Sequence, residues 1–418
     1  MSAPVATVLR VPLLPAPGLA RTLTYATLVH TVGRGLWLTA SALMLTRSVG
    51  LSVAEVGIAL SAAALVNLVV ASPMGYLADR LGPRRVYLLS GFALAVLTAG
   101  IALAGSFVAY LGLAVLIAVA DSANVGARGA VIAGGVPADQ RVRTRAYLRA
   151  TTNVGISVGA VIAGAGIAVD TRAAYQVLII ANAAFFLLAA LMLIRLAPIP
   201  RVPAPASGPR LLALRDRPFL AFVALDGLMS MHFTLLNVAL PLWIADHTDA
   251  PRWLISVLLL VNTTMVVLFQ VRASRGTADL PGAARASRRA GVAIGAACVL
   301  FAAAGGMPTA AAVALLVAGA LAHVVGELWH SAAGWGISFG LAPAHAQGQY
   351  QGTYGMGFSL GRMVAPVLVT TLAIGWGTPG WIVLGVLFLL LGAAIPPVVR
   401  WAAGTRTPAG EREAVAVG

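Results

Sequence analysis

Charged residues are scarce in this 418-residue chain, and lysine is missing altogether. Charged side chains make up 10% of the residues, whereas soluble domains carry roughly 25%, so an ordinary soluble protein is excluded. The single cysteine, Cys298, excludes a disulfide framework. The sequence also has no phosphate loop, no nucleophile–His–acid set and no cluster of metal ligands. It therefore predicts neither an enzyme nor an ATP-driven pump, and no metal or cofactor.

Long apolar runs are what the chain has instead. Hydrophobic residues make up 60% of it, and runs of about 20 residues recur along its whole length, each long enough to cross a bilayer as a helix. The predicted fold class is therefore an all-α membrane protein with twelve transmembrane helices. The predicted spans are 20–46, 52–76, 84–105, 107–128, 146–168, 173–196, 218–244, 252–272, 289–306, 308–332, 350–374 and 379–400.

The net charge of +15 follows the membrane pattern. Loops on one side of the predicted membrane carry most of the arginines, and the other side carries only Arg47, Arg172 and Arg252. Arginine accumulates on the cytoplasmic face. We therefore expect a multi-pass protein of the cell (inner) membrane with both termini in the cytoplasm. Its partner is the lipid bilayer, and nucleic acid is excluded as a partner.

A Pro- and Arg-rich stretch at 197–217 divides the chain near its middle. Its composition is typical of an extended cytoplasmic linker. It separates an N-terminal six-helix half, 20–196, from a C-terminal six-helix half, 218–400, with cytoplasmic tails at 1–19 and 401–418. A shift of 206 residues places Asp121 on Glu327 and Gly155 on Gly361, which favours two pseudo-symmetric halves.

The segment "GYLADRLGPRR" at 75–85 joins the second and third predicted spans. Gly75 would let two helices approach closely, and Gly82 suits a tight turn. Asp79 would either cap a neighbouring helix or pair with an arginine. The arginines of the segment would by themselves serve as cytoplasmic anchors. They are Arg80, Arg84 and Arg85.

This segment resembles the loop signature of the major facilitator superfamily, G-x-L-a-D-r-x-G-r-r, with Pro83 at a commonly basic position. The resemblance implies a cytoplasmic latch between the two halves that opens during alternating access. The glycines of the fifth predicted span, Gly155, Gly159 and Gly164, resemble the motif of the bacterial twelve-span drug:proton antiporters. Ala160 and Ala163 depart from that motif, which leaves the direction of transport open.

Few ionisable residues fall deep inside the predicted spans. In the family that the chain resembles, the first, fourth, seventh and tenth spans line a central cavity. Each of these spans carries one acid or arginine here: Arg34, Asp121, Asp226 and Glu327. A charge in mid-membrane needs water or a partner, which a cavity would supply. The alternative is a static ion pair, such as Arg34 with Asp121 or Asp226, that only fixes helix packing.

His323 and Glu327 would share one helix face because they are four residues apart. We expect Glu327, Asp226, Asp121 and His323 to take part in proton coupling. Arg34 and His232 are candidate residues of the cavity, and four further residues would line an adaptable apolar pocket. These are Met229, Phe233, Trp329 and Tyr354. Hydrogen-bonded structure, core packing or lipid contact is the alternative for each histidine and each apolar residue.

These features together predict a secondary active transporter. The leading interpretation is proton-coupled export of a small, largely apolar compound, with a small molecule and protons as partners and a monomer as the working unit. The first alternative is proton-coupled uptake of a small organic solute. An alternative of another class is a membrane receptor or assembly subunit that transports nothing.

Overall fold

The computed structural model describes residues 12, 14–200, 202–203 and 210–406. The regular structure of these residues is helical, as the sequence predicts. Both predicted tails and the predicted linker extend beyond them. Arg10, Arg201 and Arg412, which contribute to the predicted charge asymmetry, lie outside the described residues.

Two compact units make up the chain. Unit 1 contains Met1–Leu211 together with Ala344–Gly352, and unit 2 contains Leu212–Pro343 together with Thr353–Gly418. The division near 211 falls within the predicted linker. The segment Ala344–Gly352, which the sequence places in the C-terminal half, is part of unit 1 because its glycines pack on a helix of that unit.

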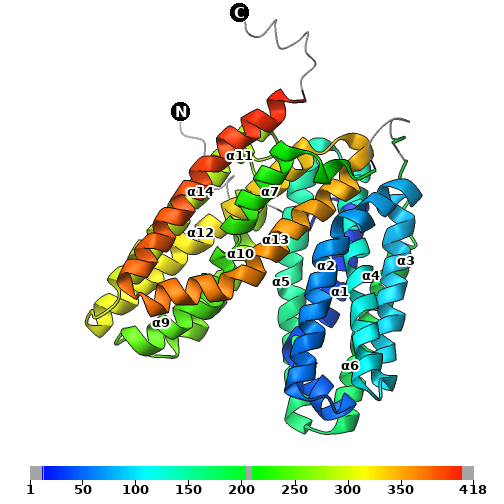
Figure 1. Ribbon diagram of the computed structural model, residues 1–418, viewed down its shortest axis with the longest axis horizontal. Helices are drawn as coiled ribbons and strands as arrows, with labels where there is room; N and C mark the ends of the chain where they lie inside the picture. Colours follow the sequence, from blue (N-terminus) through cyan, green and yellow to red (C-terminus); the bar gives the residue numbers. More distant parts are fainter. Residues whose placement is uncertain (1–11, 13, 201, 204–209, 407–418) are drawn as a thin grey trace, which may run out of the picture. The chain divides into compact units, whose positions relative to one another are not determined.

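Six long helices form the main body of unit 1, drawn from blue to green in Figure 1. They are α1 (Leu19–Leu43), α2 (Val53–Leu81), α3 (Pro83–Gly100), α4 (Phe107–Gly135), α5 (Ala138–Val169) and α6 (Arg172–Leu193).

Unit 2 contains the remaining helices, drawn from green to red in Figure 1. They are α7 (Arg217–Met229), α8 (His232–Thr234), α9 (Leu240–His247), α10 (Leu254–Ala273), α11 (Leu280–Ala303), α12 (Thr309–Leu341), α13 (Gln347–Thr370) and α14 (Thr378–Gly404). Helix α13 begins in unit 1 and continues in unit 2.

The same pattern of helix pairing occurs in both units. In unit 1, α3 packs on α4 and α6, α2 packs on α4, and α1 packs on α6. In unit 2, α11 packs on α12 and α14, α10 packs on α12, and α7 packs on α14. The pairing agrees with two pseudo-symmetric halves, with α7, α8 and α9 together forming one span.

Eleven helical segments among the described residues are long and apolar enough to cross a membrane, and α1 is the remaining long helix. Several helices are longer than the predicted spans: α5 begins at Ala138 instead of 146, and α12 ends at Leu341 instead of 332. The apolar run marks only the part of a helix that suits the hydrocarbon core. A polar end continues the helix, as the Asp139 turn of α5 does.

The seventh span is broken between α7 and α9. The backbone N–H of Met231 bonds to the carbonyl of Leu228, and the N–H of Phe233 bonds to the carbonyl of Ser230, so the helix tightens there. A π-helical stretch at Leu235–Ala239 follows and comes before Pro241, whose ring has no N–H to donate. The short α8 between these irregularities carries His232 into the interior of unit 2.

Candidate functional site

A chain of four buried polar side chains runs through the interior of unit 2. Asp226 Oδ1 lies 3.2 Å from His330 Nε2, and His330 Nδ1 lies 3.1 Å from His232 Nε2. His232 Nδ1 in turn lies 3.2 Å from His323 Nε2. None of the four residues is more than 3% exposed. Three histidines and one carboxylate therefore form one connected hydrogen-bonded chain.

Three elements hold this chain. Asp226 comes from the last turn of α7, His232 comes from α8, and His323 and His330 come from α12. Positions 323, 327 and 330 recur at intervals of four and three residues, which places them on one face of α12. The break after α7 brings His232 between the two histidines of α12.

Glu327 occupies the same face of α12 and is 4% exposed. Its Oε2 accepts a 2.9 Å hydrogen bond from Asn262 Nδ2 of α10. A carboxyl group in such an apolar stretch is costly unless it has polar partners or access to water. The amide of Asn262 is one such partner, and His323 lies one turn away along α12.

Aromatic rings pack around the histidine chain. The Phe233 ring lies 4.1 Å from the His232 ring, centroid to centroid, and Tyr354 of α13 stacks on Phe222 at 6.0 Å. A side chain at Gly334 would collide with the Tyr354 hydroxyl and would come within 3.0 Å of Asp226 Oδ1. Tyr354 and Asp226 thus both reach α12 at Gly334, at the end of the histidine chain.

Two of the residues that we expected in the apolar pocket belong to the hydrophobic core of unit 2. Met229 is completely buried among other core residues, and Trp329 packs against the same core while partly buried. This placement favours the packing alternative for Met229, whereas Trp329 also lines a second, smaller pocket beside Arg275 and Arg285. Core residues and pocket residues are both apolar, so the sequence alone does not distinguish them.

Unit 1 contains a separate charged pair. Arg34 of α1 and Asp121 of α4 lie 3.8 Å apart, with side chains 43% and 26% exposed. One turn before Arg34, the His30 ring stacks on Phe186 at 4.6 Å. Arg34 and Asp121 thus form the ion pair that the sequence offered as the alternative to a cavity role.

Asp79 caps the first turn of α13. Its Oδ1 accepts a 2.7 Å hydrogen bond from the backbone N–H of Gly348, and its Oδ2 accepts a 3.0 Å bond from that of Gln349. These N–H groups belong to the helix start, where no intrahelical acceptor exists. A carboxylate is favoured there by the helix dipole. Of the two alternatives that the sequence left open for Asp79, the structure shows capping.

In the rest of segment 75–85, Gly75 also contacts the start of α13, and the arginines have other surroundings. Gly75 meets the backbone of Gly348 so closely that no Cβ would fit, and Gly82 has a φ of 99° in the turn between α2 and α3. The Arg84 guanidinium donates to the Ile194 carbonyl at 2.7 Å. The Arg80 guanidinium lies over the Tyr76 ring at 5.6 Å. Arg85 is exposed.

The glycines of the fifth span divide into two kinds. Gly155 and Gly159 face α1 and leave no space for a Cβ, since Gly159 touches the Val32 carbonyl and Gly155 touches Thr31. Gly164, in contrast, faces open space. The first two therefore allow α1 and α5 to pack closely, and Gly164 takes no part in this contact.

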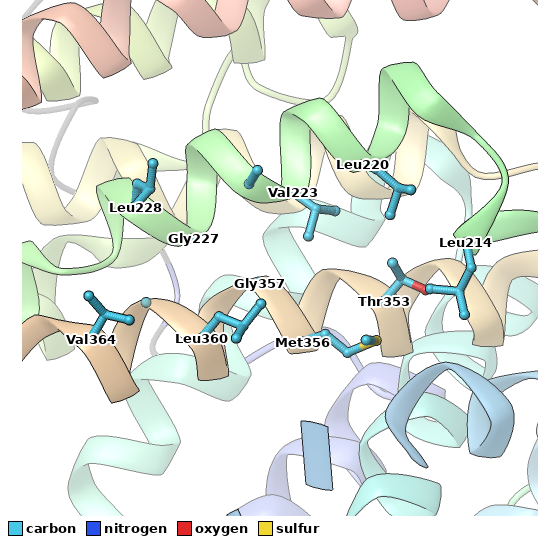
Figure 2. A pocket seen from close by; sticks show the side chains of 12 residues that line it. Leu214, Leu220, Val223, Gly227, Leu228, Thr353, Met356, Gly357, Leu360 and Val364 are labelled. Atoms are coloured by element: carbon cyan, nitrogen blue, oxygen red, sulfur yellow. The ribbon is translucent and has the colours of Figure 1, made fainter. Parts of the chain in front are cut away.

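An apolar pocket of about 360 Å³ lies between α7 and α13 in unit 2 (Figure 2). Thr353 supplies the only polar side chain among its twelve lining residues, which otherwise include Leu220, Val223, Met356 and Leu360. Its volume falls within the range of about 300–1,000 Å³ that is typical of small-molecule pockets. Gly227, Gly357 and Gly361 line it as well, where the backbones of α7 and α13 come into contact.

Sequence reasoning missed two members of the unit 2 site. The spacing of His330 from His323 and Glu327 places all three on one helix face, so the position of His330 could have been predicted from the sequence. Asn262 had no such signal, because an amide in an apolar span does not indicate which helix it will contact. The Asp226–His330 contact is also invisible in sequence, since the two residues are 104 positions apart.

Two helical repeats, membrane-spanning segments and buried ionisable groups together define a multi-pass membrane transporter. A sequence profile described as "Major Facilitator Superfamily" matches residues 23–333. The chain belongs to the major facilitator superfamily. A transporter of this superfamily handles small molecules within the membrane and is not an enzyme.

Solved structures share the fold at low sequence identity. A bacterial homologue of the iron transporter ferroportin has a TM-score of 0.71 at 14% identity, covering 92% of this chain and 99% of that one. The human organic anion transporter TETRAN has a TM-score of 0.66 at 16% identity, covering 94% and 100%. The E. coli fucose:proton symporter FucP has a TM-score of 0.66 at 14% identity, covering 92% and 98%. The search of curated proteins gives no match.

Proposed function

We propose that this transporter couples proton movement to the transport of a small molecule by alternating access. The observation that carries the proposal is the buried chain from Asp226 through three histidines, with Glu327 on the same face of α12. Carboxyl and imidazole groups inside membrane spans are typical of proton relays in transporters. A static packing role would not require four titratable groups in one hydrogen-bonded series.

Export of a small, largely apolar compound, such as a drug or secondary metabolite, is the transport mode that we favour. Two observations support it. The pocket between α7 and α13 is almost entirely apolar. The Gly155 and Gly159 contacts with α1 lie in the segment that resembles the antiporter motif. The predicted setting is the cell membrane, with both termini in the cytoplasm and the monomer as the working unit.

Proton-coupled uptake of a small organic solute is the second candidate. FucP is a fucose:proton symporter, and the structurally similar XylE is a proton:xylose symporter with a TM-score of 0.62. Both have the fold of this chain. The degraded antiporter motif, with Ala160 and Ala163, is the feature of this sequence that agrees with uptake.

Transport by the purified full-length protein in proteoliposomes tests the proposal. An imposed pH gradient should drive uphill movement of at least one compound in a panel that includes the aromatic cation ethidium and the sugars fucose and xylose. Proteoliposomes without a gradient and protein-free liposomes are the controls. Movement against the proton gradient indicates export, and movement with it indicates uptake. Uphill transport at the same rate with and without the pH gradient would overturn proton coupling.

A further inference from the structure

The two ends of the histidine chain fix the positions of its hydrogens. His323 Nε2 lies 3.0 Å from the backbone carbonyl oxygen of His232, as well as 3.2 Å from His232 Nδ1. A carbonyl oxygen can only accept a hydrogen bond. The hydrogen of neutral His323 is therefore on Nε2, and its Nδ1 carries a lone pair.

This assignment also determines the hydrogen positions of the next two histidines, His232 and His330. His232 Nδ1 accepts from His323, so the hydrogen of His232 is on Nε2, which donates to His330 Nδ1 at 3.1 Å. The hydrogen of His330 is then on Nε2, which donates to the Asp226 carboxylate at 3.2 Å. One carbonyl and one carboxylate thus set three tautomers, and all three hydrogen bonds point toward Asp226.

At the other end of the histidine chain, one ring nitrogen of His323 has no hydrogen-bond partner among the described residues. This nitrogen, Nδ1, is buried, and the whole His323 side chain is inaccessible to solvent. A buried acceptor without a hydrogen-bond partner is energetically unfavourable. The chain therefore ends in a buried lone pair that is free to accept a proton. Glu327, one turn further along α12, is the nearest acid in sequence to this nitrogen.

We propose that Asp226, His330, His232 and His323 form a directional proton wire, with His323 Nδ1 as its entry and Asp226 as its terminus. A proton binds to His323 Nδ1, and the Nε2 proton of His323 moves to His232 Nδ1. The Nε2 proton of His232 then moves to His330 Nδ1, and that of His330 moves to Asp226. One N–H bond breaks as the next forms, and one proton is gained overall by the Asp226 carboxylate.

The contact of His323 with the His232 carbonyl also favours restoration of the original hydrogen positions after transfer. After transfer, all three bonds are reversed and intact, but His323 Nε2 bears a lone pair that faces the His232 carbonyl. This repulsion favours the original arrangement. It returns when the Asp226 proton moves to His330 Nε2, the His330 Nδ1 proton moves to His232 Nε2, the His232 Nδ1 proton moves to His323 Nε2, and His323 Nδ1 releases its proton. Other charged or titratable groups near the chain are Glu327 on α12, Tyr354 on α13 and Arg362 on α13, whose guanidinium lies over the Phe358 ring.

His232 is the decisive residue for a test, because it contacts a histidine on each side. In His232→Gln the amide can still accept one hydrogen bond and donate another, but it cannot relay a proton. The proton wire serves coupled transport only on the basis of the proposed function, but the test of the wire needs no substrate. Purified protein in liposomes is subjected to an acidic pH jump, and the infrared carbonyl band of protonated Asp226 is followed in time. Asp226→Asn identifies the band.

The wire predicts rapid protonation of Asp226 in the wild type and protonation about a hundredfold slower in His232→Gln, a typical loss when a positioned proton donor is removed. His247→Gln is the matched control, because His247 stacks on Trp243 in the same unit and outside the chain. His330→Gln should slow the band as His232→Gln does, which guards against a folding defect peculiar to one variant.

Two results would overturn the wire. One is equal protonation rates in the wild type and His232→Gln. The other is a 15N NMR spectrum of histidine-labelled protein at rest in which His323 carries its hydrogen on Nδ1. Failure of the proposed function has a different signature: the Asp226 band would form rapidly through His232, while no compound of the transport panel responds to a pH gradient.

Discussion

The Oδ1 atom of Asp79 lies 2.7 Å from the backbone nitrogen of Gly348 and accepts its hydrogen bond. This contact joins the end of α2 to the beginning of α13, at positions 269 residues apart in the chain. It uses both carboxylate oxygens, because the second oxygen accepts from Gln349. Asp79 thus forms a specific hydrogen-bonded contact between α2 and α13, in addition to being part of a charged loop.

Asp79→Asn should impair transport while leaving expression and membrane insertion nearly normal. Asparagine has one acceptor oxygen, so one of the two backbone N–H groups loses its partner, and the charge that complements the helix dipole disappears. We expect the contact between α2 and α13 to weaken by about 1–2 kcal/mol. Transport by membrane-inserted protein measures the effect, and wild-type transport at normal insertion would refute a gating role.

Arg34→Ala should destabilise unit 1 by leaving the Asp121 carboxylate without its arginine. Because both side chains are partly exposed, we expect a loss of about 1–2 kcal/mol, less than for a fully buried pair. Thermal unfolding in detergent measures this loss. In the double variant Arg34→Ala/Asp121→Asn, part of the stability should return. A stable and fully active Arg34→Ala protein would contradict a role for the pair.

Glu327→Gln should abolish transport driven by a pH gradient and preserve substrate exchange without a gradient. Glutamine keeps the size of the side chain and can still bond to Asn262, but it cannot carry a proton. Uphill transport and exchange, measured side by side in proteoliposomes, separate the two effects.

Asp226→Asn is the comparison for Glu327→Gln, because Asp226 is the second buried carboxylate of unit 2. If Glu327→Gln pumps normally and Asp226→Asn does not, Asp226 carries the proton and Glu327 has another role. If both variants pump normally, the driving proton uses neither acid, and proton coupling through this site is wrong.

Gly159→Ala should destabilise the packing of α1 on α5. An added Cβ would collide with the Val32 carbonyl and lie 2.8 Å from the Leu36 nitrogen, and backbone atoms cannot move aside as a flexible side chain can. We expect a loss of about 1–3 kcal/mol. Thermal unfolding of the purified protein in detergent gives the value.

Gly164→Ala is the matched control on the same helix. Its Cβ would meet open space, and alanine favours a helix over glycine by up to about 1 kcal/mol. This variant should therefore be neutral or slightly stabilised. Equal destabilisation by both substitutions would show that helix propensity, and not the contact with α1, governs this region.

The sequence by itself determined the membrane class, the number of spans and the family. These follow from local properties: runs of apolar residues, the separation of arginines between loops and the segment 75–85, all of which can be recognised without knowing any contact. The positions of Asp226, Glu327 and His323 within spans were predictable for the same reason, since a charge in an apolar run is visible wherever the run folds.

Only the tertiary structure decided which of these groups meet. His232 and His330 are 98 residues apart, and Glu327 and Asn262 are 65 apart, and neither distance in the chain predicts contact. The break after α7 rotates His232 inward, and the close fit of α12 at Gly334 brings Asp226 to the end of the histidine chain. Hydrophobic periodicity tells which residues avoid lipid or water, but it does not specify the partner of a buried polar group. That partner is set by the packing of helices against one another.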